Sequence, residues 1–336
     1  KYYITGGIGA QYDGEAFGKN YQLPNRAYNE TCAAIANVFW NHRMFLMKGD
    51  SKYIDVLERT LYNAVLPGIS FEGNTFFYPN VLEFDGKDPF NQGATERKPW
   101  FNCSCCPSNL SRFIPAVPGY FYAQKNNQIF ANIFAASVTD FQVENKNFQI
   151  EQITRYPWDG NIKFTISAEE PVDFSFNIRV PGWAQNKPVP GDLYSYLENP
   201  QKEVRLFVNN EPVPLETING YVDLKRTWNN GDVVELSLPM QLHKVIPHKN
   251  VKEISGHVAI ERGPIVYCAE QADNPGGVLD KTISEETSFT PLYDAGLLQG
   301  VVKLQSEELT LVPYYAWSHR NLGEMAVWFN RGSGIF

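Results

Sequence analysis

One short stretch reads Phe101-Asn102-Cys103-Ser104-Cys105-Cys106-Pro107-Ser108-Asn109 and holds three of the chain's five cysteines. A disulfide inside this stretch is disfavoured, because bridging neighbouring cysteines strains the backbone. Thiols this close together indicate soft ligands for a metal, an activated nucleophile, or both. The alternative is that these cysteines are small buried hydrophobic residues.

A fourth cysteine, Cys32, lies far upstream and follows Glu30 by two positions. Apolar residues recur at helical spacing from residue 31 to about residue 47, which predicts a helix there. Two residues that are two positions apart point to nearly opposite sides of a helix interior. Glu30 and Cys32 can therefore bind one metal only if Glu30 lies in the turn before the helix, near its positive end.

The helical pattern continues in two further segments and then stops. A second helix is expected over residues 51–64, with Leu57 and Leu61 on its apolar face, and a third over residues 109–117. After about residue 120 the spacing of apolar residues changes to two, and turn residues separate short strands. We expect helices before residue 122 and β-sandwiches after it. Cys268 lies in an apolar strand-like run and is expected in the core.

Composition excludes some classes of function. The chain has 336 residues, 43% of them hydrophobic, and a formal net charge of −8, and it contains no basic cluster. A nucleic-acid partner is therefore not expected. No apolar run reaches membrane-spanning length, so we expect a soluble protein without a membrane partner and leave its compartment, cytoplasmic or periplasmic, open. The absence of an initiator Met and of a signal peptide suggests that the natural beginning is missing.

Several motifs together resemble glycoside hydrolase family 127, the β-L-arabinofuranosidases and their close relatives. The resemblance covers nearly the whole chain, and the cysteine stretch combined with Glu30 and Cys32 is its most specific part. The motifs that carry it are Thr5-Gly6-Gly7-Ile8-Gly9, Gly14-Glu15-Ala16-Phe17, Glu30-Thr31-Cys32-Ala33-Ala34, Glu58-Arg59-Thr60-Leu61-Tyr62-Asn63, Cys103-Ser104-Cys105-Cys106-Pro107, Arg179-Val180-Pro181-Gly182-Trp183 and Glu261-Arg262-Gly263-Pro264.

This resemblance implies a multidomain fold of α and β parts. Residues 1–122 would form the C-terminal part of a catalytic (α/α)₆ barrel, residues 123–245 a β-sandwich, and residues 246–336 a second β-sandwich that is incomplete or irregular at its end. The N-terminal half of the barrel would come from the same gene product or from another chain. Apolar helix faces, such as that of Leu57 and Leu61, would then lack partners within this chain.

The resemblance also implies a retaining glycoside hydrolase that removes β-L-arabinofuranosyl or a related sugar from a plant-type arabinose-containing glycan or oligosaccharide. By motif match, the ligands of its zinc cofactor would be Glu30, Cys32, Cys105 and Cys106. Cys105 would also be the nucleophile and Glu15 the general acid/base. Glu58 and Tyr78 would contact the sugar, and Cys103 would lie nearby without binding the metal.

Two other functions remain open from the sequence. Four protein ligands close a zinc site, whereas catalytic zinc keeps one position for water or substrate. A non-catalytic carbohydrate-binding protein with a structural zinc is therefore an alternative. A hydrolase that uses metal-bound water is a third possibility, although the sequence contains no HExxH motif.

Overall fold

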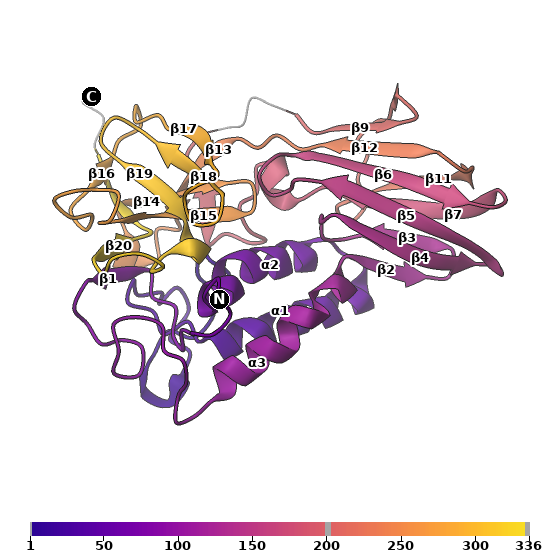
Figure 1. Cartoon of the computed structure of the whole chain (residues 1–336). Helices are drawn as coiled ribbons and strands as arrows, with labels where there is room; N and C mark the ends of the chain where they lie inside the picture. Colours follow the sequence, from indigo (N-terminus) through magenta and orange to yellow (C-terminus); the bar gives the residue numbers. More distant parts are fainter. Residues whose placement is uncertain (1, 199–202, 333–336) are drawn as a thin grey trace.

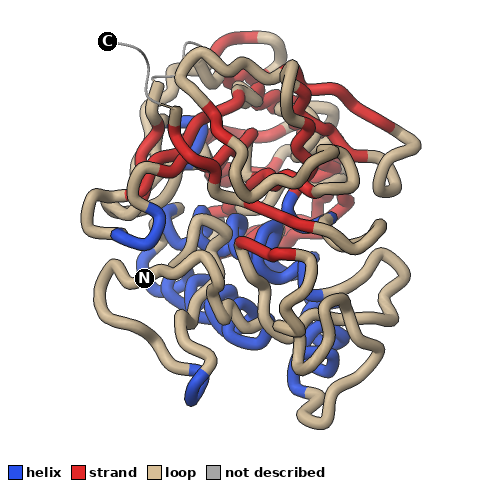
Figure 2. Tube along the Cα trace, turned by 90° about the vertical axis from the view of Figure 1, so that its left-hand side faces the viewer, coloured by secondary structure: helices blue, strands red, loops and turns tan. Residues whose placement is uncertain are grey.

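The computed structural model describes residues 2–198 and 203–332, and this part of the chain is mostly β (Figure 1). A helical part, residues 2–121, lies below the sheets, and the view turned by 90° shows the same separation of helices from strands (Figure 2). Its helices are α1 (Thr31–Lys48), α2 (Lys52–Thr60) and α3 (Cys105–Phe113), with 3₁₀ or π turns η1 (Asp13–Glu15), η2 (Leu61–Val65), η3 (Leu66–Gly68) and η4 (Ile114–Tyr120). Within the described ranges, no helix has both the length and the apolar character that a membrane crossing requires.

The predicted helices exist, but one of them begins earlier than expected. α3 starts at Cys105 rather than at residue 109, and therefore includes two cysteines in its first turn. Pro107 is tolerated there because the first-turn N–H groups have no intrahelical acceptor. Pro115 follows α3, where the chain continues as the 3₁₀ turn η4. The earlier start changes the position of the thiols from a loop to a helix N-terminus.

Three helices form one core, and this corrects an expectation about α2. Leu57 is fully buried and Leu61 is 5% exposed, so neither lacks partners within the chain. Both belong to a cluster that α1, α3 and Tyr221 of a later strand complete. The expectation was wrong because residues of α1 and α3, together with Tyr221 from a later strand, join α2 in one core.

Two sheets between residues 122 and 237 pack face to face. The first strand after the helices begins at Tyr122, which agrees with the expected change at residue 122. Rings from opposite sheets meet, with centroids 4.7 Å apart for Phe148 and Phe174 and 5.2 Å apart for Phe164 and Phe176. In sheet order the strands are β10 (Glu211–Pro212), β9 (Arg205–Val208), β12 (Val233–Ser237), β6 (Asn161–Ala168), β5 (Lys146–Thr154) and β4 (Ser137–Val143), opposite β11 (Tyr221–Trp228), β7 (Val172–Arg179), β3 (Gln128–Ala131) and β2 (Tyr122–Lys125).

A third sheet contains the C-terminal strands and two strands from earlier parts of the chain, β8 and β1. Cys268 is fully buried in its centre, as predicted. The expected domain boundary at residue 245 falls inside strand β13 (Leu242–Pro247). Both partners of β13 belong to this third sheet, so by sheet membership the division lies before Leu242. The strands are β16 (Thr282–Ile283), β21 (Phe329–Arg331), β14 (His257–Arg262), β15 (Ile265–Glu270), β19 (Thr310–Pro313), β18 (Val301–Gln305) and β17 (Thr290–Asp294), with β13 (Leu242–Pro247), β8 (Tyr194–Tyr196), β20 (Glu324–Ala326) and β1 (Glu83–Asp85) attached.

The helical part is bound to this third sheet by strand pairing and buried polar contacts. β1 pairs with β20, with Glu83 opposite Ala326. Arg59 of α2 forms an ion pair of 2.9 Å with Glu261 of β14, and both side chains are buried. The Asn63 amide donates to the Pro264 carbonyl at 2.8 Å. These contacts hold the helices against the C-terminal strands.

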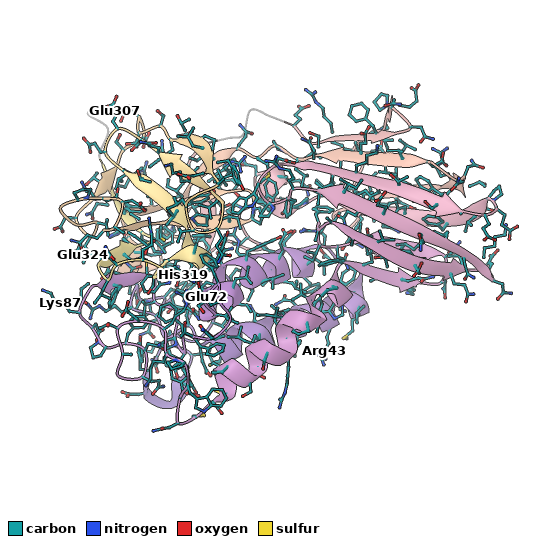
Figure 3. The ribbon with its side chains drawn as sticks, viewed as in Figure 1. Arg43, Glu72, Lys87, Glu307, His319 and Glu324 are labelled. Carbon is teal, nitrogen blue, oxygen red and sulfur yellow. The ribbon has the colours of Figure 1, made fainter. Side chains whose placement is uncertain are left out.

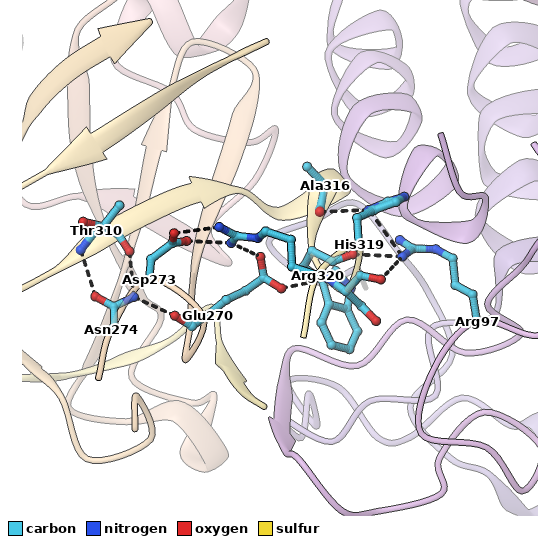
Figure 4. A network of polar contacts seen from close by, with 10 residues as sticks. Arg97, Glu270, Asp273, Asn274, Thr310, Ala316, His319 and Arg320 are labelled. Carbon is cyan, nitrogen blue, oxygen red and sulfur yellow. Dashed lines mark hydrogen bonds and ion pairs between the residues drawn. The ribbon is translucent and has the colours of Figure 1, made fainter. Parts of the chain in front are cut away.

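A second connection joins residues 66–98 to the loop after β19 (Figure 4). The Arg97 guanidinium donates to the carbonyls of Pro67, Trp317 and Ser318 at 2.8–3.0 Å. His319 lies beside Ala316 and stacks on Phe71 with ring centroids 3.9 Å apart. Figure 3 shows His319 and Glu72 close together at this junction. Burial, followed by the charge of Arg97, lowers the pKa of His319 to about 4.

We expect this histidine to make folding stability depend on pH. Below pH 6.5 the unfolded chain binds a proton at His319 that the folded chain excludes, so stability falls from about pH 6.5 to about pH 4. The full shift corresponds to about 3 kcal/mol, and partial exposure of the ring reduces this to about 1–2 kcal/mol. His319→Gln should be less stable than the parent at pH 7, and denaturant titrations should show that difference shrinking toward pH 4. A stability difference between the two proteins that stays constant with pH would contradict the lowered pKa of His319.

Candidate metal and catalytic site

Glu30 lies just before α1, where the backbone is not yet helical. It is the N-cap residue, with φ −59° and ψ 136°, which confirms the predicted position. The neighbouring Thr31 N–H donates to the Tyr78 carbonyl at 2.9 Å, and Glu30 forms an isolated antiparallel bridge with Pro79. This local pairing turns the Glu30 carboxylate to the same side as Cys32 in the first turn of α1.

The two adjacent cysteines lie in the first turn of α3, which packs beside α1 in the same core. Cys105 is half-buried and Cys106 is fully buried. The first turns of two helices therefore meet at one point. The positive ends of helices stabilise negatively charged ligands such as carboxylates and thiolates.

Four donor atoms come together there, from Glu30, Cys32, Cys105 and Cys106. All four lie within 4.8 Å of one another. Glu30 Oε1 is 3.6 Å from the Sγ atoms of both Cys105 and Cys106, and these two sulfurs are 3.8 Å apart. Ligands about 2.1–2.3 Å from a tetrahedral zinc lie about 3.6–3.8 Å from one another. The spacing of these donor atoms therefore fits a zinc ion.

The electrostatics of these groups also fit a cation. Burial raises the pKa of the Cys105 thiol to about 12. Burial and then the negative charge of Glu15 raise the pKa of Glu30. Hydrogen bonding with Cys106 lowers the pKa of Cys32, and the same bond raises the pKa of Cys106. Without a positive charge between them, these donors cannot all be negatively charged at neutral pH.

Two further side chains contact the thiols. The Asn109 amide donates to Cys32 Sγ at 3.0 Å. The Tyr78 hydroxyl lies 3.0 Å from Cys105 Sγ and 3.9 Å from Cys103 Sγ. Cys103 is exposed and is not part of the four-atom cluster. Tyr78, itself buried, therefore lies directly against the Cys105 sulfur.

Glu15 lies at the end of the turn η1, with an exposed side chain. Its φ of 51° is in the left-handed region, which non-glycine residues other than Asn and Asp adopt at a cost. The Tyr28 hydroxyl donates to Glu15 Oε1 at 2.9 Å. The hydrogen bond from Tyr28, two positions before Glu30, joins this loop to the segment that leads into α1.

Glu58 lies elsewhere. Its carboxylate is buried, with an ion pair of 2.6 Å to Arg179 of β7 and a hydrogen bond of 2.9 Å from the Tyr156 hydroxyl. Asp55, one turn earlier in α2, pairs with the same guanidinium at 2.8 Å. The structure thus places Tyr78 against the thiols and connects Glu15 to Tyr28, whereas Glu58 lies at the contact between the helices and the middle sheets.

Comparison with known proteins matches the chain in three consecutive regions. Residues 1–119 match the β-L-arabinofuranosidase GH127 catalytic domain, residues 128–240 the GH127 middle domain, and residues 242–330 the glycoside hydrolase family 127 C-terminal domain. The chain belongs to glycoside hydrolase family 127. The family resemblance read from the cysteine stretch is thereby confirmed.

Individual proteins similar to this chain are β-arabinofuranosidases by name. A non-reducing end β-L-arabinofuranosidase of Bifidobacterium longum subsp. longum is 33% identical, in a match covering 98% of this chain and 53% of that protein. A solved GH127 β-arabinofuranosidase is 44% identical with a TM-score of 0.94, covering 99% of this chain and 54% of its own. A solved GH127 β-L-arabinofuranosidase from Geobacillus stearothermophilus T6 is 33% identical with a TM-score of 0.89, and the match covers 99% of this chain and 55% of that chain. This GH127 chain thus spans about half the length of these relatives.

Two residues of this GH127 chain that contact candidate site residues in the structure, Tyr28 and Arg179, were not identified from the sequence. Tyr28 was only a neighbour of Glu30 in the sequence, yet its hydroxyl contacts Glu15. Arg179 stood out only as part of an Arg-Val-Pro-Gly-Trp motif, yet it is fully buried between two carboxylates. A signal was available for Arg179, since a charged residue inside an apolar strand requires a buried partner.

Proposed function

We propose that this chain carries the metal-binding and nucleophilic part of a retaining glycoside hydrolase that removes β-L-arabinofuranosyl or a related sugar. The observation that carries the proposal is the spacing of Glu30, Cys32, Cys105 and Cys106, which fits zinc while leaving Cys105 partly exposed beside Tyr78. The names of the relatives support the sugar. The substrate would be an arabinose-containing glycan or oligosaccharide.

Each side chain has a proposed role in the reaction. A bound zinc would keep the Cys105 thiol deprotonated at neutral pH, as thiol ligands of zinc are. The Cys105 sulfur attacks the anomeric carbon while Glu15 gives a proton to the leaving oxygen. Glu15 then takes a proton from water, which displaces the sulfur and releases the sugar with retained configuration. Tyr78, beside the thiol, remains the proposed sugar contact, whereas for Glu58 that role rests on the resemblance alone.

The proposal also concerns the domain architecture of the whole enzyme. Residues up to about 122 would be the C-terminal part of an (α/α)₆ barrel, followed by two β-sandwich domains. α1 supports this, because Trp40, Leu46 and Met47 on its outer side are more than 60% exposed, and Arg43 points outward among them (Figure 3). Large exposed apolar patches mark surfaces that bind other protein. The remaining barrel helices would pack there, from the same gene product or from another chain.

The runner-up function is a non-catalytic carbohydrate-binding protein with a structural zinc. The observation in its favour is that Glu30 and three thiols already supply four ligands, which closes a tetrahedral site. A structural zinc would be required for folding but for no reaction.

The decisive experiment assays the intact protein against nitrophenyl β-L-arabinofuranoside and a panel of other nitrophenyl pentosides. We expect cleavage of the arabinofuranoside, about one zinc per chain by metal analysis, and loss of both after treatment with a strong chelator. Cleavage that persists in zinc-free protein would reject the metal role. Sugar binding without cleavage of any pentoside would favour the non-catalytic function.

A further inference from the structure

The loop that carries Glu15 is held by few contacts. Backbone hydrogen bonds close it, since the N–H groups of Ala10 and Gln11 both reach the Ala16 carbonyl at 3.1 Å. Gly14, with φ 66°, adds local freedom beside Glu15. Among the residues that the structure describes, the Tyr28 hydroxyl is the one hydrogen-bond partner of the Glu15 carboxylate. The direction of this carboxylate therefore depends on Tyr28.

Tyr28 itself is firmly placed. Its side chain is 4% exposed and belongs to the core that α1 and α3 share. Its carbonyl accepts a hydrogen bond from the Asn80 N–H at 3.2 Å. The ring contacts Tyr12 edge-on, with centroids 4.9 Å apart, and lies 6.3 Å from the ring of Tyr78. The buried ring of Tyr28, packed between Tyr12 and Tyr78, therefore gives its hydroxyl a defined position.

We propose that Tyr28 is a positioning residue for the acid/base Glu15, and that it determines which carboxylate oxygen exchanges the proton. The inference rests on the proposed function. The hydroxyl of Tyr28 occupies Oε1, so Oε2 holds the transferable proton. In the first step this proton moves from Oε2 to the glycosidic oxygen, the bond from the anomeric carbon to that oxygen breaks with its electron pair on oxygen, and the bond from Cys105 Sγ to carbon forms.

The second step reverses these roles. A proton of the incoming water returns to Oε2, the water oxygen bonds to the anomeric carbon, and the carbon–sulfur bond breaks with its electron pair on Cys105 Sγ. Oε1 stays bonded to Tyr28 throughout. A hydrogen bond at one oxygen thus fixes the second oxygen in the geometry that proton transfer needs.

The test is Tyr28→Phe in the intact protein, which keeps the ring and removes only the hydroxyl. Substrates with a poor leaving group need the proton, so we expect their kcat/KM to fall about 10- to 100-fold. The kcat/KM of a nitrophenyl substrate should fall less than about 3-fold, because kcat/KM reports the first step and a nitrophenolate leaves without needing a proton. Zinc content should not change. Tyr12→Phe is the matched control from the same aromatic group and should change neither rate.

A readout independent of activity separates this inference from the proposed function. Amide hydrogen exchange of residues 10–17 should be faster in Tyr28→Phe than in the parent and in Tyr12→Phe. Unchanged exchange would overturn the positioning role even in an active enzyme, and so would an equal loss on both substrate types. If the parent cleaves no pentoside, the proposed function is wrong. The catalytic part of this inference is then wrong as well, even if amide exchange in residues 10–17 changes as expected. In an active parent, nonadditive losses in Tyr28→Phe, Glu15→Gln and their double variant would support the coupling.

Discussion

Cys105→Ser should lower kcat/KM of the intact protein by about 10⁴-fold or more, the size of loss seen when an enzyme's nucleophile is removed. A serine hydroxyl at the start of α3 would not ionise at neutral pH, and its oxygen is a poorer nucleophile toward carbon than a thiolate. Three of the four metal ligands remain in this variant. We therefore expect weaker but measurable zinc binding, checked by metal analysis alongside the rates.

Two other cysteines provide matched controls. Cys103→Ser changes an exposed thiol two positions away that is not part of the four-atom cluster, and should leave both zinc and activity close to the parent. Cys106→Ser changes a fully buried ligand and should lose zinc and activity together. If Cys105→Ser keeps both zinc and full activity, the nucleophile is a different group. If no variant changes any rate because the parent is inactive, the structural-zinc alternative gains support.

Arg179→Met should destabilise the fold by about 3–5 kcal/mol, the usual cost of removing one partner from a buried ion pair. The side chain is completely buried between Asp55 and Glu58, over the ring of Phe134. Burial already raises the pKa of Asp55 to about 6, against the lowering effect of Arg179. Without the guanidinium, two carboxylates would lie close together with no cation, so at least one would have to bind a proton.

Denaturant titration measures this loss, and the chain offers a matched control. Arg155 pairs with Asp159 at 3.4 Å, but its side chain is 71% exposed. Arg155→Met should therefore change stability by less than about 0.5 kcal/mol. Equal effects of both substitutions would mean that the buried pair contributes little. Glu58→Gln adds a second comparison, because a residue that only contacts sugar would raise KM without lowering the midpoint of unfolding.

Residue type and local spacing predict a cluster of thiols with a carboxylate, whereas the choice of Cys105 and Cys106 over Cys103 is what the family resemblance implies. Glu30, Cys32, Cys105 and Cys106 lie in two short segments, and each segment begins a helix. The partner of Glu58 could not be predicted in the same way. Arg179 follows it by 121 positions, in a strand whose register no local pattern specifies. The burial of Leu57 and Leu61 could not be predicted for the same reason, since the core that contains them also includes Tyr221 of a distant strand.

The pairing of β1 with β20 has a consequence for biosynthesis. Glu83 lies opposite Ala326, so the ribosome must add 243 further residues before this pair can form. At about 5–20 residues per second this takes roughly 12–50 s. During that time Phe84 of β1, which is 2% exposed in the finished fold, has no strand beside it. The nascent helical segment therefore exposes an apolar, unpaired strand until β20 has been synthesised.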